Sequence, residues 1–289
     1  MPGAGASGWN REAAMAFGRS FLTENGGLEE YRGPGGAVLL PEDTRMVLEG
    51  AFRGCGAVTA VTVPYRVSDL REEAFCGCTA LEQADLPETL QFIGPRAFRS
   101  CGSLRTLTVP DSVTRLGEGA FENCRSLEMV RLSGRLTCLE RAVFYGCSRL
   151  REVLLPQRLT AIGPEAFYQC GSLKELQIPA GVTEIGDSAF YQCAGLETVI
   201  LPPALETLEE NVFGDCGSLR RLALPPGLRS IRGYAFWNCT ALTRVEIPDT
   251  VTDLADGAFE DCPNLTIAAK PDTPAAAYAR EHQIPLEEL

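Results

Sequence analysis

The sequence predicts a right-handed parallel solenoid, a rod built of stacked coils, and two observations support this fold class. Phenylalanine recurs every 23 residues, ten times in succession, at Phe52, Phe75, Phe98, Phe121, Phe144, Phe167, Phe190, Phe213, Phe236 and Phe259. Cysteine keeps the same period three residues later, from Cys55 to Cys262. A repeat of constant length, with no insertion or deletion, is typical of proteins in which each unit stacks on its neighbours.

One repeat shows how a coil is built. Residues 106–109 alternate polar and apolar side chains, which is the pattern of a strand with one buried face. Pro110 ends the strand because it has no N–H to donate. Val113 and Leu116 form a second apolar pair, and the stretch 117–121 predicts a tight turn into a helical or 3₁₀ turn. Each coil therefore has three short sides with apolar residues pointing inward.

The periodic region spans residues 37–265, with a partial first coil followed by ten 23-residue units. The first coil is partial because Glu29 stands where a phenylalanine is due. Residues 1–36 form an N-terminal segment, in which two short strands around Asn25-Gly26 predict a hairpin-like cap. Such a cap is needed because an uncapped stack exposes its core and a strand edge.

The last segment, residues 266–289, predicts a cap for the other end of the rod. Residues 274–282 are rich in alanine and start with proline, which favours a helix. A short strand is expected to follow at 284–286.

Composition limits the classes of partner. The chain has 289 residues, 45% of them hydrophobic, and a formal net charge of −12. Nucleic-acid binding depends on clustered Lys and Arg that release counterions, so a nucleic-acid partner is disfavoured. No apolar run approaches the roughly 20 residues that span a bilayer, so membrane insertion is not expected. The first twenty residues lack the features of a secretory signal, which indicates a cytoplasmic protein if Met1 is the native start.

The periodic cysteines are expected to be buried free thiols. Stacked side chains in a parallel solenoid lie about 4.8 Å apart and parallel, whereas a disulfide needs converging Cβ atoms about 3.8 Å apart. Cys76 and Cys138 stand outside this periodic column. They are either exposed, oxidisable thiols or accidental surface cysteines.

The repeat unit Leu-x-x-Leu-x-Val-Pro-x-x-Val-x-x-Ile/Leu-Gly-x-x-Ala-Phe-x-x-Cys-x-x-Leu resembles the BspA-like class of bacterial leucine-rich repeats over residues 37–265. The opening segment 26–33 and the Ala-rich helix ending near 284–285 are also similar to that family. The resemblance implies a curved leucine-rich-repeat solenoid with a parallel sheet on one face, short turns and 3₁₀ or helical turns elsewhere, and capped ends. It also implies a bacterial cell-surface or secreted protein that acts in adhesion by binding host or matrix proteins.

An enzyme is not expected, and neither is a metal or cofactor. His282 is the only histidine, which argues against histidine general-base catalysis, Cys–His dyads and the usual zinc sites. Glycines such as Gly117, Gly163 and Gly186 recur with the repeat, so they are assigned to turns and not to a phosphate-binding loop. The family that the repeat resembles is not defined by catalytic residues, so no catalytic residue is assigned.

The leading hypothesis is a non-catalytic scaffold that binds a protein through the outward face of its sheet. Apolar and charged side chains mix there as they do in protein interfaces, although scattered exposed apolar residues are also normal. The candidate residues are Met129, Arg131, Glu152, Leu154, Glu175, Gln177, Thr198 and Ile200.

The alternative partner is a glycan, bound by a strip of aromatic rings. One column, one position after each phenylalanine, contains Tyr145, Tyr168, Tyr191 and Trp237. Rings stacked at the coil spacing offer a carbohydrate-binding surface, or they simply cover the turn and stabilise one another.

Overall fold

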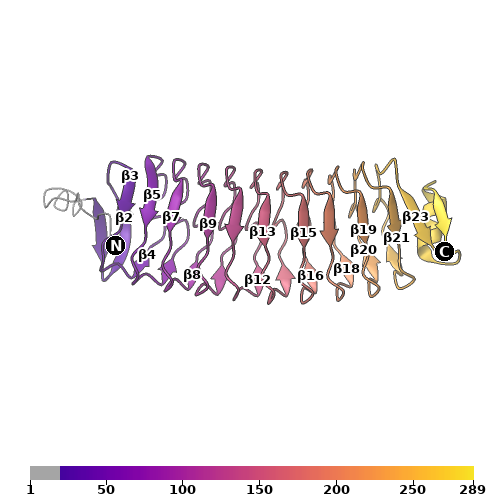
Figure 1. Cartoon of the computed structure of the whole chain (residues 1–289), viewed down its shortest axis with the longest axis horizontal. Coiled ribbons are helices and arrows are strands. Elements are labelled where there is room, and N and C mark those ends of the chain that lie inside the picture. The colour runs from indigo at the N-terminus through magenta and orange to yellow at the C-terminus, as the bar shows by residue number, and fades with distance from the viewer. Residues whose placement is uncertain (1–19) are drawn as a thin grey trace, which may run out of the picture.

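The computed structural model describes residues 20–289, so the first part of the expected N-terminal segment, residues 1–19, lies outside the described residues. The chain forms a rod of coils stacked along its long axis, with the N-terminal hairpin at one end and a helix at the other (Figure 1). Strands in successive coils pair in parallel along the rod. The predicted parallel β-solenoid is therefore confirmed.

One side of the rod is the predicted sheet face. In the seven strands from β9 to β21, the central residue is buried and its two neighbours are exposed. Among residues 20–289 this face is divided into three hydrogen-bonded sheets, with breaks between β7 and β9 and between β13 and β15. Its strands are β3 (Gly36–Leu39), β5 (Val58–Thr62), β7 (Gln83–Asp85), β9 (Thr106–Thr108), β11 (Met129–Arg131), β13 (Glu152–Leu154), β15 (Glu175–Gln177), β17 (Thr198–Ile200), β19 (Arg221–Ala223), β21 (Arg244–Glu246), β23 (Thr266–Ala269) and β24 (Leu286–Glu288).

A second side of the rod also carries parallel strands, which the sequence did not predict. Each is only two residues long, too short for alternation to be visible in the sequence. The strands are β4 (Met46–Val47), β6 (Asp69–Leu70), β8 (Phe92–Ile93), β10 (Arg115–Leu116), β12 (Cys138–Leu139), β14 (Ala161–Ile162), β16 (Glu184–Ile185), β18 (Thr207–Leu208), β20 (Ser230–Ile231) and β22 (Asp253–Leu254).

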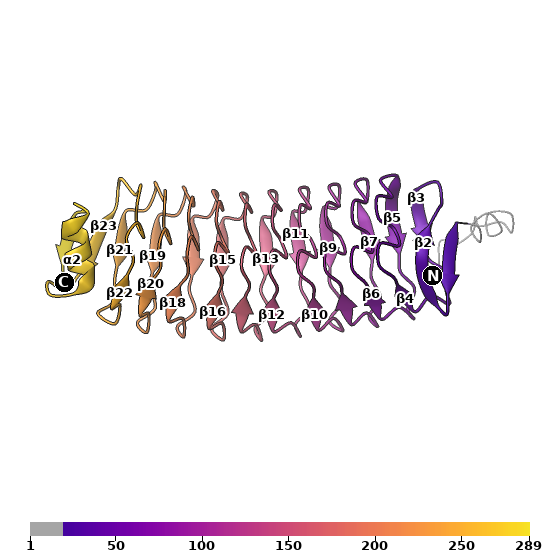
Figure 2. The same ribbon diagram turned by 180° about the vertical axis from the view of Figure 1, so that it is seen from behind.

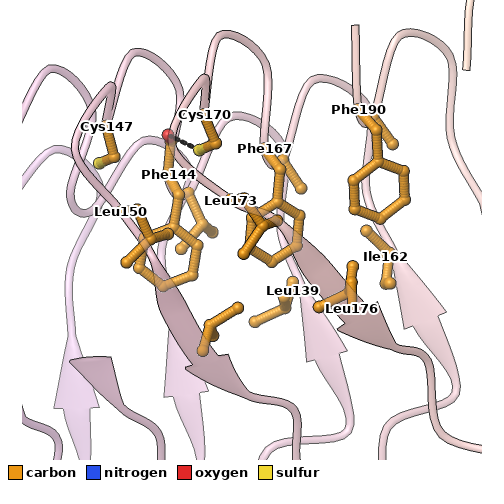
Figure 3. Packing of buried hydrophobic residues seen from close by; sticks show 14 of the residues in the cluster. Leu139, Phe144, Cys147, Leu150, Ile162, Phe167, Cys170, Leu173, Leu176 and Phe190 are labelled. Carbon is orange, nitrogen blue, oxygen red and sulfur yellow. Dashed lines mark hydrogen bonds between the residues drawn. The ribbon is translucent and has the colours of Figure 1, made fainter. Parts of the chain in front are cut away.

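The phenylalanines form one continuous buried stack through the ten repeats. Nine consecutive ring pairs have centroids 4.8–5.7 Å apart, and Phe98 and Phe121 lie 5.7 Å apart. Each ring is at most 2% exposed. Figure 3 shows three successive rings of the stack, Phe144, Phe167 and Phe190, with leucines and Ile162 beside them. Residues that share a phase in the repeat thus lie one above another in a single core.

Two residues in the left-handed backbone region flank each phenylalanine of the stack. Around Phe121 these are Gly119 (φ 58°) and Asn123 (φ 58°). Because a left-handed residue interrupts a helical path, the predicted helical turn consists of single hydrogen-bonded turns, such as Cys124 N–H to Phe121 O at 3.2 Å.

The recurring glycines play a different part from the one expected. Gly117, Gly163 and Gly186 do not have positive φ, so they are not needed for the turn conformation. A Cβ at Gly117 would lie 2.3 Å from the backbone N of Pro95 in the preceding coil. These glycines allow the backbones of neighbouring coils to approach closely.

All twelve cysteines are free, and eight of them are buried. Each buried thiol donates a hydrogen bond to the carbonyl of the phenylalanine one coil earlier, at 3.1–3.3 Å, as Figure 3 shows for Cys170 and Phe144. The same phenylalanine carbonyl also accepts a hydrogen bond from the backbone N–H of the cysteine three residues later in its own coil. The thiol of the next coil therefore gives this carbonyl a second hydrogen bond. Burial raises the pKa of Cys124 to about 12, which keeps the thiol protonated as the donor. The expectation of buried free thiols is confirmed for eight of the ten periodic cysteines, whereas Cys55 and Cys262, in the first and last of the ten repeats, are free but half-buried.

Cys76 and Cys138, outside the periodic column, are half-buried. Burial raises the pKa of both thiols. The thiol of Cys138 also donates to the carbonyl of Leu139 at 3.4 Å.

At the N-terminal end, β1 (Phe21–Glu24) and β2 (Gly27–Tyr31) pair antiparallel around the Asn25-Gly26 turn. Tyr31 occupies the phenylalanine position of this first unit. Its ring lies 4.9 Å from Phe52, and its N–H donates to the carbonyl of Ala51 at 2.8 Å. The N–H groups of the first nine phenylalanines donate in the same way to carbonyls of the next coil. The stack therefore starts two residues after Glu29, an offset that a strict 23-residue count misses.

At the C-terminal end, α2 (Pro274–Glu281) lies across the last coil (Figure 2). The hydroxyl of Tyr278 accepts a hydrogen bond from the N–H of Phe259 at 3.3 Å, and its ring meets Phe259 edge-on at 6.1 Å. In earlier coils the phenylalanine N–H donates to a carbonyl of the next coil, and at this end of the rod the Tyr278 hydroxyl takes the place of that carbonyl. The strand predicted at 284–286 is β24, Leu286–Glu288, two residues later.

Candidate binding surfaces

The eight predicted sheet-face residues lie together on four strands, β11 to β17, and all eight are exposed. Parallel pairing places Met129 beside Glu152 and Arg131 beside Leu154. On the next pair of strands, Glu175 lies beside Thr198, and Gln177 beside Ile200. The alternation in the sequence is sufficient to find this face, because it fixes which side of each strand points outward.

A depression of about 1150 Å³ lies in the middle of this face. Six of the eight predicted residues line it, whereas Met129 and Arg131 lie outside it. Sequence reasoning missed Arg151 and Lys174, which also line it. Both directly precede a strand, so their place beside the sheet follows from the same register.

The depression coincides with the break between β13 and β15. These two strands are not paired in the described structure, although β13 pairs with β11 and β15 pairs with β17. Gly171, Ser172 and Gly195, with small or no side chains, also line it. A shallow site with apolar and charged walls results.

The apolar side chains around the depression are well exposed. Leu154 is 81% exposed, Ile200 56% and Met129 47%. Large apolar side chains exposed among charged residues on one face are typical of surfaces that bind another protein.

The predicted aromatic strip forms, but its rings cover one another. Tyr145 and Tyr168 lie 4.6 Å apart, and Tyr168 and Tyr191 lie 5.1 Å apart. Trp237 reaches over Gly214 to stack on Tyr191 at 6.3 Å, and its Nε1 donates to Asp261 at 3.1 Å. Burial raises the pKa of Tyr168. Since a sugar stacks on a free ring face, this geometry supports mutual stabilisation of the rings more than sugar binding.

His282 lies on the last coil's cap. Its ring stacks on Tyr278 at 4.1 Å, and its Nε2 is 3.9 Å from Asp256. A second depression of about 820 Å³ lies here, between the last coil and α2.

Within residues 20–289 no group of three or more His, Cys, Asp or Glu side chains is placed to hold a metal ion. None of the helices in that same range is both long and apolar enough to cross a membrane.

These features define a repeat protein of the leucine-rich class, a β-solenoid with an open sheet face. Residues 45–171 and 139–266 match the BspA type leucine rich repeat region in six copies, and the chain belongs to this family. The predicted resemblance is therefore confirmed.

Several solved structures are similar to this chain, and one of them, the pneumococcal vaccine antigen PcpA, shows the same fold. PcpA is 16% identical, with a TM-score of 0.59 over 86% of this chain and 78% of that one. A leucine rich cell surface protein from Faecalibacterium prausnitzii A2-165 is 22% identical, with a TM-score of 0.44 over 90% and 94%. The leucine rich repeat protein TpLRR of T. pallidum is 29% identical, with a TM-score of 0.49 over 70% and 88%. None of the curated proteins matches this chain.

Proposed function

We propose that the chain is a non-catalytic scaffold that binds a protein ligand through its sheet face, centred on the depression beside Leu154. Adhesion at a bacterial cell surface is the setting that the BspA-type repeats suggest. The observation that carries the proposal is the exposure of Leu154 and Ile200 on the rim of one depression, with charged and amide side chains between them.

The stacked core supports this role because it makes the face rigid. Each coil is fixed to the next by ring stacking and by backbone and thiol hydrogen bonds. A rigid surface loses little conformational entropy when it binds, which leaves more of the contact energy as affinity.

The proposal is tested with a Leu154→Asp, Ile200→Asp double variant. Binding of the chain to purified matrix proteins (fibronectin, laminin and collagen) is measured by biolayer interferometry. We expect a matrix protein to bind the unaltered chain and to lose at least about tenfold in affinity for the double variant, because each aspartate must be desolvated against apolar surface.

The matched control adds the same two negative charges to the second face. Thr160→Asp and Thr183→Asp alter exposed residues there and should leave binding unchanged. Equal loss in both variants, with unchanged circular dichroism, would mean that net charge and not the sheet face determines binding. Binding that survives the Leu154 and Ile200 changes would defeat the assignment of the face.

The glycan alternative is tested separately. A carbohydrate that used Tyr145, Tyr168, Tyr191 and Trp237 would change the tryptophan fluorescence, since Trp237 ends the strip. A glycan array without signal, together with constant fluorescence on addition of sugars, would eliminate it.

A further inference from the structure

One column of side chains beside the sheet face is charged in seven successive coils. Its members stand 23 residues apart, directly before or at the start of the sheet strands, and we call them the charged column: Glu82, Arg105, Glu128, Arg151, Lys174, Glu197 and Arg220. Backbone hydrogen bonds join four of its six neighbouring pairs, such as Glu128 N–H to Arg105 O at 2.8 Å and Glu197 N–H to Lys174 O at 2.8 Å. The other two pairs, Glu82 with Arg105 and Arg151 with Lys174, lie at the breaks between β7 and β9 and between β13 and β15. The column therefore follows the sheet strands along the rod.

The charges of this column have no partner in the described part of the chain. None of the seven forms an ion pair within residues 20–289, although most other arginines there do. Arg131 and Arg244, on the same face, are held by Asp111 and Glu287. Six members of the column are exposed and Glu128 is half-buried, so the charges are free to meet another molecule.

The order of the charges is antisymmetric about Arg151. Residues at equal distances on either side have opposite charge: Glu128 and Lys174, Arg105 and Glu197, Glu82 and Arg220. The next residues outward, Thr59 and Thr243, are both neutral. This pattern suits an isologous dimer, because the two-fold axis brings residue i against j and j against i, so that opposite charges meet.

We propose that the sheet face binds a second copy of the same chain, antiparallel, with the two-fold axis passing through the coil that holds Arg151 and Leu154. The inference rests on the proposed use of the sheet face for protein binding, and it names the partner. A two-fold axis parallel to the strands turns the rod end for end and places the charged column of one copy against that of the other. Each of the three opposite-charge pairs then forms twice.

Leu154 occupies the centre of this arrangement. It is the most exposed large hydrophobic side chain among residues 20–289, and on the axis it meets Leu154 of the second copy. Ile200 lies opposite Thr108, whose methyl group gives it an apolar contact. The axis thus covers Leu154 and Ile200, the two most exposed apolar residues of this face, while Met129 lies opposite Glu175.

Like charges meet only at the axis itself. Arg151 faces Arg151 of the second copy, and Glu152 faces Glu152. Because the adjacent residues Arg151 and Glu152 have opposite charges, each Arg151 is also within reach of Glu152 of the other copy. The other outward residues of the sheet, from Thr62 to Glu246, bring no further like charges together in this register.

Nine coils at about 4.8 Å give a strip about 40 Å long, which places the interface at the small end of specific protein contacts. We therefore expect a weak dimer that dissociates in high salt.

The test exchanges charges within the column. An acidic variant carries Arg105→Glu and Lys174→Glu, and a basic variant carries Glu128→Lys and Glu197→Lys. Each variant alone faces like charges at four places in the dimer, whereas a mixture of the two restores attraction at all four. Sedimentation velocity over a wide concentration range measures association of the unaltered chain, of each variant and of the equimolar mixture.

We expect the unaltered chain to dimerise, each variant to associate at least about tenfold more weakly, and the mixture to recover the affinity of the unaltered chain. The control variant Arg135→Glu, Arg158→Glu makes the same charge change as the acidic variant outside the column and should dimerise normally. Circular dichroism verifies the fold, and Leu154→Asp provides a second variant that should weaken the dimer.

A chain that stays monomeric at every concentration would overturn the dimer, and so would a dimer that the variants leave unchanged or a mixture that fails to recover. A matrix protein whose binding depends on Leu154 would, in that case, still support the proposed function. The two failures are therefore distinguishable.

Discussion

Phe167 and Tyr168 are adjacent residues that each stack on two aromatic rings, but only one of them is buried. Phe167 lies 5.3 Å from both Phe144 and Phe190 and is fully buried. Tyr168 lies 4.6 Å from Tyr145 and 5.1 Å from Tyr191 and is half-buried. Replacing each by alanine separates the contribution of burial from that of ring stacking.

We expect Phe167→Ala to lower the free energy of unfolding by about 3–5 kcal/mol, because it removes a buried ring and leaves a cavity in the core. Tyr168→Ala removes two ring contacts at about 0.5–1 kcal/mol each and leaves no enclosed cavity, so its cost should be about 1–2 kcal/mol. The difference, about 1–4 kcal/mol, reports on burial.

Urea denaturation followed by far-UV circular dichroism measures both values, provided that each variant unfolds in one transition with the slope of the unaltered chain. The slope is the necessary control, because a central defect can uncouple the two halves of a repeat array. Equal costs for the two variants would refute the reasoning, since stacking alone would then hold the coils together.

Two further predictions concern the thiols and the glycines. The pKa of Cys124 and of Cys193 is raised to about 12 in the folded chain by burial, whereas unfolded thiols ionise near 9.0. The free energy of unfolding should therefore fall as pH rises above about 9, by about 1.4 kcal/mol per pH unit for each thiol, and urea titrations of a Cys124→Ala, Cys193→Ala variant should show a smaller fall. Gly117→Ala places a Cβ 2.3 Å from Pro95 and should cost about 1–3 kcal/mol, whereas Gly102→Ala meets nothing within 4 Å and should leave the melting temperature nearly unchanged.

The core and the sheet face were predictable because the repeat fixes them. Once Phe98 and Phe121 are known to share a phase, every residue between them has a fixed place in the coil, and alternation along each strand decides which side chains point outward. This is why Leu154 and Ile200 could be placed on one face from the sequence. The charged column was readable by the same register, because its positions are also 23 residues apart.

Other features depend on differences between coils that share the same pattern. The break between β13 and β15, which forms the depression, separates two strands whose sequences are as regular as their neighbours. Tyr31 continues the ring stack with an offset of two residues, which periodicity cannot reveal. The role of Gly117 was misassigned because a glycine required for close approach and a glycine required for positive φ look alike in a sequence.

The alignment of phase-matched residues in one buried column is tested most directly by alkylating the native chain and following each cysteine by mass spectrometry. The eight buried thiols should stay unmodified while the four half-buried cysteines, Cys55, Cys76, Cys138 and Cys262, are alkylated first. Urea should then make all twelve cysteines react. Alkylation of the eight at the rate of Cys76 in the native chain, or disulfides among them, would contradict the stacked solenoid from which the binding face is derived.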